Sequence, residues 1–173
     1  MNSHRYFAAV LLLSVAMVAN ASQVIRFSSD RASVPLPESF RVVVTGGNVM
    51  ATFGADGDHT LELSLLAALS KPDGATDLGL RFVKAQGEKK GAKVVSDGGR
   101  ATFSEPGGKE KRGGKTFQAM HWQIGVGNCV FTMTLTAPLP MSQELDAFLG
   151  EPLNTIVNEL SCSAPRQIAG AGV

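Results

Sequence analysis

The sequence predicts an α+β domain whose antiparallel sheet is covered on one face by two helices. Several short segments alternate apolar and polar residues, which is the pattern of half-buried strands. Short glycine-rich turns separate most of them, and such turns join antiparallel neighbours. Two longer segments place apolar residues at helical spacing, so each can cover the apolar face of the sheet.

The first strands are predicted before residue 70. They are residues 24–27, 41–45, 49–53 and 60–67. Pro35 and Pro37 are expected to end pairing after the first strand, because proline cannot join a central ladder. The turn Gly46-Gly47-Asn48 predicts that the second and third strands form a hairpin. The fourth strand alternates leucines with polar residues, which indicates that one of its faces is buried.

Residues 76–86 predict the first helix. Thr76 or Asp77 can cap its start. Gly79 is unfavourable within it, and Gly87 is expected to end it. Its predicted apolar face is formed by Leu78, Phe82 and Ala85.

Four more strands are predicted after this helix. They are residues 94–95, 100–104, 116–124 and 129–136. In the last, apolar residues beginning at Cys129 alternate with threonines, and a threonine face suits an exposed or lightly covered surface. In the strand before it, Met120, Trp122 and Ile124 share a face, which predicts a core stripe. Pro138 is expected to stop the last strand.

The final helical segment is predicted to begin after Ser142, which can cap it. One apolar stripe continues to Leu160. Gly150 and Pro152 interrupt the segment, so a kink or two helices in series are expected.

Residues 1–21 have the order of a cleavable secretory signal peptide. Arg5 precedes an apolar run, and Ala19-Asn20-Ala21 offers the small residues that a signal peptidase reads. An uncleaved anchor is the alternative. The run is shorter than the roughly 20 residues of a comfortable membrane span, so no stable membrane insertion is expected after cleavage. A periplasmic or secreted protein is expected, with one domain over residues 22–163 and a disordered tail over 164–173.

The charge balance argues against two classes of partner. Removing Arg5 leaves 15 of the 16 basic residues against 15 acidic residues, so the net charge of the remaining chain is about zero. A neutral domain has no overall attraction to nucleic acid or to anionic lipid. No nucleic-acid partner is therefore expected.

Two cysteines, Cys129 and Cys162, lie in the exported part. An even count in an oxidising compartment favours one disulfide between them. Two buried free thiols are the alternative, and Cys162 lies off the apolar stripe of the last helix. The helix must therefore end before Cys162 if that residue is to reach Cys129.

The order of these elements resembles the PsbP-like superfamily, which includes photosystem extrinsic proteins and bacterial DcrB-type periplasmic proteins. The resemblance spans most of residues 24–161 and is carried by element order and by the strand-to-helix ending at residues 131–161. It implies an antiparallel sheet with helices, and an accessory or protein-binding role. The superfamily shares no set of catalytic residues, so the resemblance assigns no site residue to this chain.

Motifs that carry chemistry are scarce. Asp56, Asp58 and His59 are weak metal candidates, because an EF-hand needs a Glu at its twelfth position and Ala67 stands there, counted from Asp56. An aspartate-glycine turn is the favoured interpretation. His121 is expected to face solvent from a strand. No catalytic residue, metal or other cofactor is predicted, and the chain lacks G-x-S-x-G and H-E-x-x-H motifs.

Residues 106–115 are predicted to be an exposed glycine-rich loop. Its spacing does not match a phosphate-binding loop, and no helix follows it. Exposed loops often carry binding, so this one is a candidate contact for an acidic protein partner. The candidate binding residues are Lys109, Lys111, Arg112 and Lys115.

Three functions remain open from the sequence. The first is an exported, non-enzymatic accessory or protein-binding module. The second is a periplasmic immunity or inhibitor protein against a secreted toxin. The third is a hydrolase with scattered catalytic residues, for which Asp56, Asp58 and His59 are the candidates.

Overall fold

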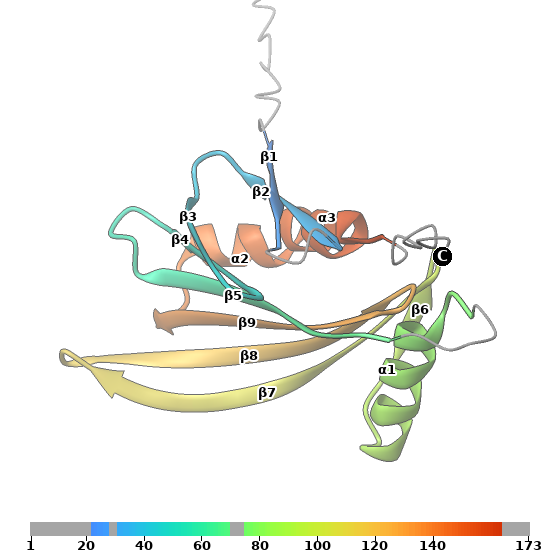
Figure 1. Ribbon diagram of the computed structural model, residues 1–173. Coiled ribbons are helices and arrows are strands. Elements are labelled where there is room, and N and C mark those ends of the chain that lie inside the picture. Colours follow the sequence, from blue (N-terminus) through green and yellow to red (C-terminus); the bar gives the residue numbers. More distant parts are fainter. Residues whose placement is uncertain (1–21, 28–30, 70–74, 164–173) are drawn as a thin grey trace, which may run out of the picture.

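The computed structural model describes residues 22–27, 31–69 and 75–163 (Figure 1). The predicted signal peptide and tail lie outside these residues. A seven-stranded antiparallel sheet, in the order β3-β4-β5-β9-β8-β7-β6, dominates the fold, and a small sheet, β1-β2-β10, lies beside the C-terminal helices. The α+β class with an antiparallel sheet is confirmed. No helix in the described part of the chain is long and apolar enough to cross a membrane.

The strands and helices have the following bounds. The large sheet contains β3 (Arg41–Thr45), β4 (Asn48–Phe53), β5 (His59–Ala68), β6 (Val95–Asp97), β7 (Arg100–Arg112), β8 (Lys115–Val126) and β9 (Cys129–Leu139). The small sheet contains β1 (Ser22–Arg26), β2 (Ala32–Pro37) and β10 (Ser161–Cys162). The helices are α1 (Leu78–Lys89), α2 (Gln143–Leu149) and α3 (Glu151–Glu159).

The main core lies between the large sheet and the layer formed by α2, α3 and the small sheet (Figure 1). Alternate residues of β8 and β9 point into it, among them Ile124, Phe131 and Met133, which are fully buried. Trp122 and Met120 pack against this core, as the apolar stripe of this strand predicted. Period-two alternation therefore identifies the buried face of the central strands.

The helices do not share one face of the sheet. The second core cluster joins Val83 of α1 to Phe103 and Val130, which point away from the main core. Helix α1 therefore packs at one end of the opposite face (Figure 1). Its buried residues are Gly79, Val83 and Gly87, whereas Phe82 is 44% exposed. The prediction of which residues form the buried face of this helix was wrong, because small residues form its contact with the sheet.

Prolines interrupt pairing less than expected. Pro35 and Pro37 lie within β2, opposite Val24 and Ser22 of β1. On its other side β2 is paired with β10 only at Ala32 and Ser33, so most of β2 is an edge there, and an edge tolerates proline. Likewise β9 continues through Pro138, beyond the end of its pairing with β5.

The predicted loop at residues 106–115 is instead a long hairpin arm of β7 and β8. Paired positions continue to Arg112 and Lys115. A register shift between Pro106 and Lys109 accommodates the proline, and Gly113 and Gly114 turn the chain with positive φ angles of 54° and 80°. Pairing with a neighbouring strand thus makes this glycine-rich segment a strand, although its composition predicted a loop.

The C-terminal expectations are confirmed. Two helices in series meet at Gly150, and the Ser142 hydroxyl accepts a hydrogen bond from the Leu145 N–H at 3.1 Å. The chain leaves α3 before β10, which pairs with β2. Cys162 consequently reaches Cys129, and the two form a disulfide with a Cα–Cα distance of 5.8 Å.

Candidate functional site

The sheet face opposite the main core is only partly covered. Strand register places Thr134 of β9 beside His121 of β8 and Glu62 of β5 on this face. Helix α1 packs at one end of it, and the remaining surface is mostly polar and partly accessible. The predicted threonine face of β9 is thus confirmed as lightly covered. We call this surface the open face.

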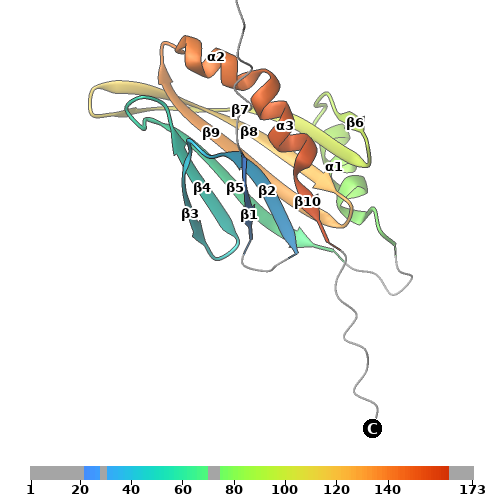
Figure 2. The same ribbon diagram turned by 90° about the horizontal axis from the view of Figure 1, so that it is seen from above.

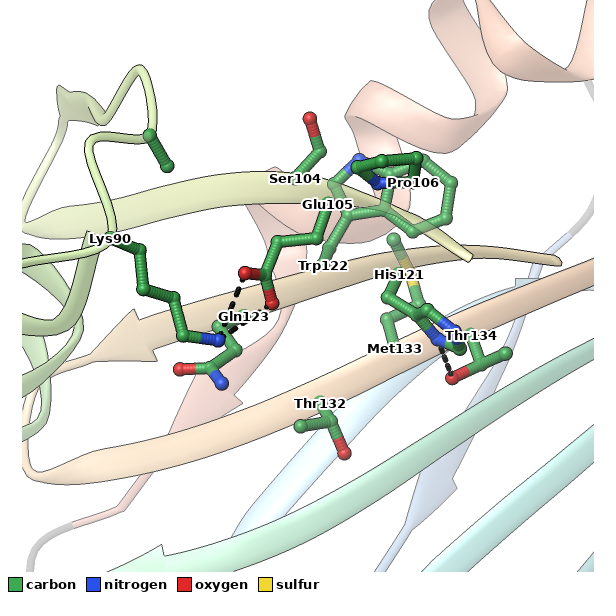
Figure 3. A pocket seen from close by; sticks show the side chains of 11 residues that line it. Lys90, Ser104, Glu105, Pro106, His121, Trp122, Gln123, Thr132, Met133 and Thr134 are labelled. Carbon is green, nitrogen blue, oxygen red and sulfur yellow. Dashed lines mark hydrogen bonds and ion pairs between the residues drawn. The ribbon is translucent and has the colours of Figure 1, made fainter. Parts of the chain in front are cut away.

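A cavity of about 750 Å³ lies on the open face where α1 ends (Figure 3). Lys90, at the end of α1, reaches across to Glu105 of β7, and its Nζ lies 2.9 and 2.8 Å from the two carboxylate oxygens. Both side chains are exposed, so solvent weakens this ion pair. The pair forms one wall of the cavity.

The floor of the cavity comes from β8 and β9. His121 Nδ1 lies 2.9 Å from Thr134 Oγ1, and both side chains are partly buried. Gln123 Oε1 is buried without a hydrogen-bond partner in the described part of the chain. The expectation of a solvent-facing His121 was therefore too simple, since the ring lies in a cavity against a neighbouring strand. The lining offers hydrogen bonds to a polar ligand.

The four predicted binding residues lie in the outer part of the arm, with Lys109 and Lys111 on one face of the hairpin and Arg112 and Lys115 on the other. All are exposed, although two of them already have partners. Arg112 pairs with Glu110 and its guanidinium lies 5.7 Å from the centre of the Phe117 ring, while Lys115 Nζ lies 3.4 Å from Asp58 Oδ2. Lys109 and Lys111 have no ion-pair partner in the described residues. They are the free cations of this surface.

The weak metal candidates do not form a shared site. Asp56 is exposed in the turn, whereas His59 is only 4% exposed and stacks on the Phe53 ring. His59 Nδ1 lies 3.0 Å from Asp58 Oδ1, and both ring nitrogens are shielded from solvent. Over the described residues, no group of three or more His, Cys, Asp or Glu is placed to hold a metal ion.

Sequence reasoning missed the cavity and its ion pair. Lys90 and Glu105 lie on different elements, and no motif links them. Their contact depends on where α1 packs, which the sequence pattern placed incorrectly. His121 and Thr134 could have been paired from the short turn between β8 and β9, because that turn sets the register.

Known proteins resemble this chain only in structure. No family model matches, and no curated protein matches in sequence. A protein from Bacteroides thetaiotaomicron is similar over 82% of this chain, with 15% identity and a TM-score of 0.59. The chain spans about half of that protein, 48% of its length. At this identity the likeness concerns the fold alone.

Two further structures resemble the chain more weakly. The Ran-binding protein Mog1p of Saccharomyces cerevisiae has 11% identity and a TM-score of 0.46, with 83% of this chain and 96% of that chain covered. Cyanobacterial PsbP of Synechocystis has 14% identity and a TM-score of 0.37, with 85% and 95% covered. The structures that resemble this chain thus include a PsbP, which belongs to the superfamily that the order of the elements resembles.

Proposed function

We propose that the chain is an exported, non-enzymatic module that binds an acidic protein partner through the tip of the β7–β8 arm. The observation that carries this proposal is the group of exposed cations at the tip, where Lys109 and Lys111 remain without an ion-pair partner in the described residues. Clustered charge of one sign attracts the opposite charge and speeds association. The pairing of β7 and β8 also holds the backbone of these residues in fixed relative positions.

Two features support export. Residues 1–21 have the pattern of a signal peptide. Cys129 and Cys162 are joined by a disulfide, and disulfides persist mainly in oxidising compartments. The burial of His59 argues against this residue as the catalytic base of a hydrolase, because neither ring nitrogen is accessible to a substrate.

The test is an affinity pull-down from the periplasmic or extracellular fraction of the source organism, with bound proteins identified by mass spectrometry. The test variant carries Lys109→Glu and Lys111→Glu. The control carries Lys84→Glu and Lys89→Glu on exposed positions of α1, which changes the net charge equally. We expect an acidic protein to be recovered with wild type and control, and at least about tenfold less with the test variant.

Equal recovery with both variants would contradict the arm as the binding surface. The identity of the captured protein separates the two binding hypotheses. A secreted toxin inactivated by this chain would indicate an immunity protein, and any other stoichiometric partner would indicate an accessory module.

A further inference from the structure

The outer side of β3 is an uncovered strand edge. β3 ends the order of the large sheet, and no other element of the described residues lies beyond it (Figure 2). Val43 and Val44 are 54% and 42% exposed there. Such an edge can pair with another extended chain, and proteins usually protect it with proline, lysine or a bulge.

The opposite edge of the same sheet, at β7, carries such protective features. Beyond its short pairing with β6, β7 has an open edge that contains Pro106, a register shift and Lys109. β3 has the sequence Arg-Val-Val-Val-Thr, with neither proline nor lysine, and its pairing with β4 is regular throughout. The contrast indicates that the β3 edge is kept available for pairing.

The hairpin register identifies the backbone groups that face outward. A two-residue turn separates Thr45 from Asn48, so these two residues form a hydrogen-bonded pair. Bonded and non-bonded pairs alternate along the ladder. Val42 and Val44 therefore direct their N–H and C=O groups away from β4, and neither residue has a backbone partner on that side within the described chain.

We infer that β3 pairs with β3 of a second copy of this chain, antiparallel and centred on Val43. This register sets Val42 opposite Val44 of the second copy, so that their outward groups bond each other. Arg41 then lies opposite Thr45, and no like charges face each other. Because β3 is polar at both ends and apolar between them, it is self-complementary under a twofold axis, as a symmetric dimer requires.

The first experiment measures the mass of the purified full chain in solution by light scattering during size-exclusion chromatography. We expect wild type to have twice the mass of one chain. Val43→Lys should have the mass of a single chain, because it places two ammonium groups opposite each other. Met50→Lys is the matched control, since Met50 is exposed on the neighbouring strand and should leave the dimer intact.

A second experiment fixes the register. Val43→Cys should form a disulfide-linked dimer on mild oxidation, whereas Val24→Cys, exposed on the edge of the small sheet, should not. A wild type that stays monomeric at high concentration would overturn the inference. So would a dimer that survives Val43→Lys, equal cross-linking of both cysteine variants, or pairing of β3 only with a different protein.

Discussion

At the scale of single residues, glycines set the distance between α1 and the sheet. A Cβ on Gly79 would lie 2.2 Å from the Cys129 carbonyl oxygen, and one on Gly125 would lie 2.4 Å from the Gly79 carbonyl oxygen. Both neighbours are backbone atoms, which cannot move aside like a flexible side chain. Sequence reasoning treated Gly79 as a weakness in the helix, although close packing requires it there.

Gly79→Ala is therefore expected to destabilise the protein, although alanine favours helix formation by about 1 kcal/mol over glycine. Forcing a methyl group into backbone contact costs roughly 1–3 kcal/mol or more. Gly108→Ala is the control, because a Cβ there meets nothing within 4 Å and the φ angle is not positive. The free energies of unfolding, measured in urea, should fall for the first variant only. Equal stability of Gly79→Ala and wild type would show that α1 does not pack this closely.

At the scale of elements, the C-terminal segment is held by the burial of α3, by a disulfide and by the short strand β10. Leu153 and Ile156 of α3 are buried in the main core, and the Cys129–Cys162 disulfide attaches β10 to the start of β9. β10 itself has only two paired positions with β2, namely Ser161 and Cys162. The disulfide is therefore the stronger attachment of the chain beyond α3.

Replacing both cysteines by serine should lower the free energy of unfolding by about 3–4 kcal/mol, because the disulfide closes a loop with a sequence separation of 33 residues. Urea unfolding of wild type with and without reductant, beside the double variant, measures this loss. Reduced wild type should lose a similar free energy of unfolding, and the double variant somewhat more, because serine places a hydroxyl at the fully buried position 129. Alkylation of both thiols in the absence of reductant, or an unchanged midpoint after reduction, would contradict the bond.

Segments whose regular structure depends on a neighbouring strand were the hardest to predict from the sequence. The period-two strands, the hairpin at Gly46-Gly47 and the break at Gly150 follow from local pattern and were predictable. The arm was not predictable, because its glycine-rich β7 segment forms a strand only through its pairing with β8. The proline-containing strand β2 was missed for a related reason, since an edge position is a property of the sheet.

At the scale of the whole molecule, the two faces of the large sheet differ in how much of each is covered by other elements. One carries the main core beneath α2, α3 and the small sheet, while the open face carries, among the described residues, α1 and the cavity beside it (Figures 1 and 3). The arm projects from this sheet (Figure 1). Its cations lie close to the turn at its free end. Alternation along β8 and β9 could predict two faces, but which helix covers which face depends on tertiary packing.

Cross-linking in the source organism can show whether the tip of the arm contacts an acidic partner. A photoreactive residue is placed at position 111 of the arm and, as control, at position 84 of α1. We expect an adduct with one acidic protein from position 111 and none from position 84. Absence of an adduct at position 111, or the same adduct from both positions, would contradict it.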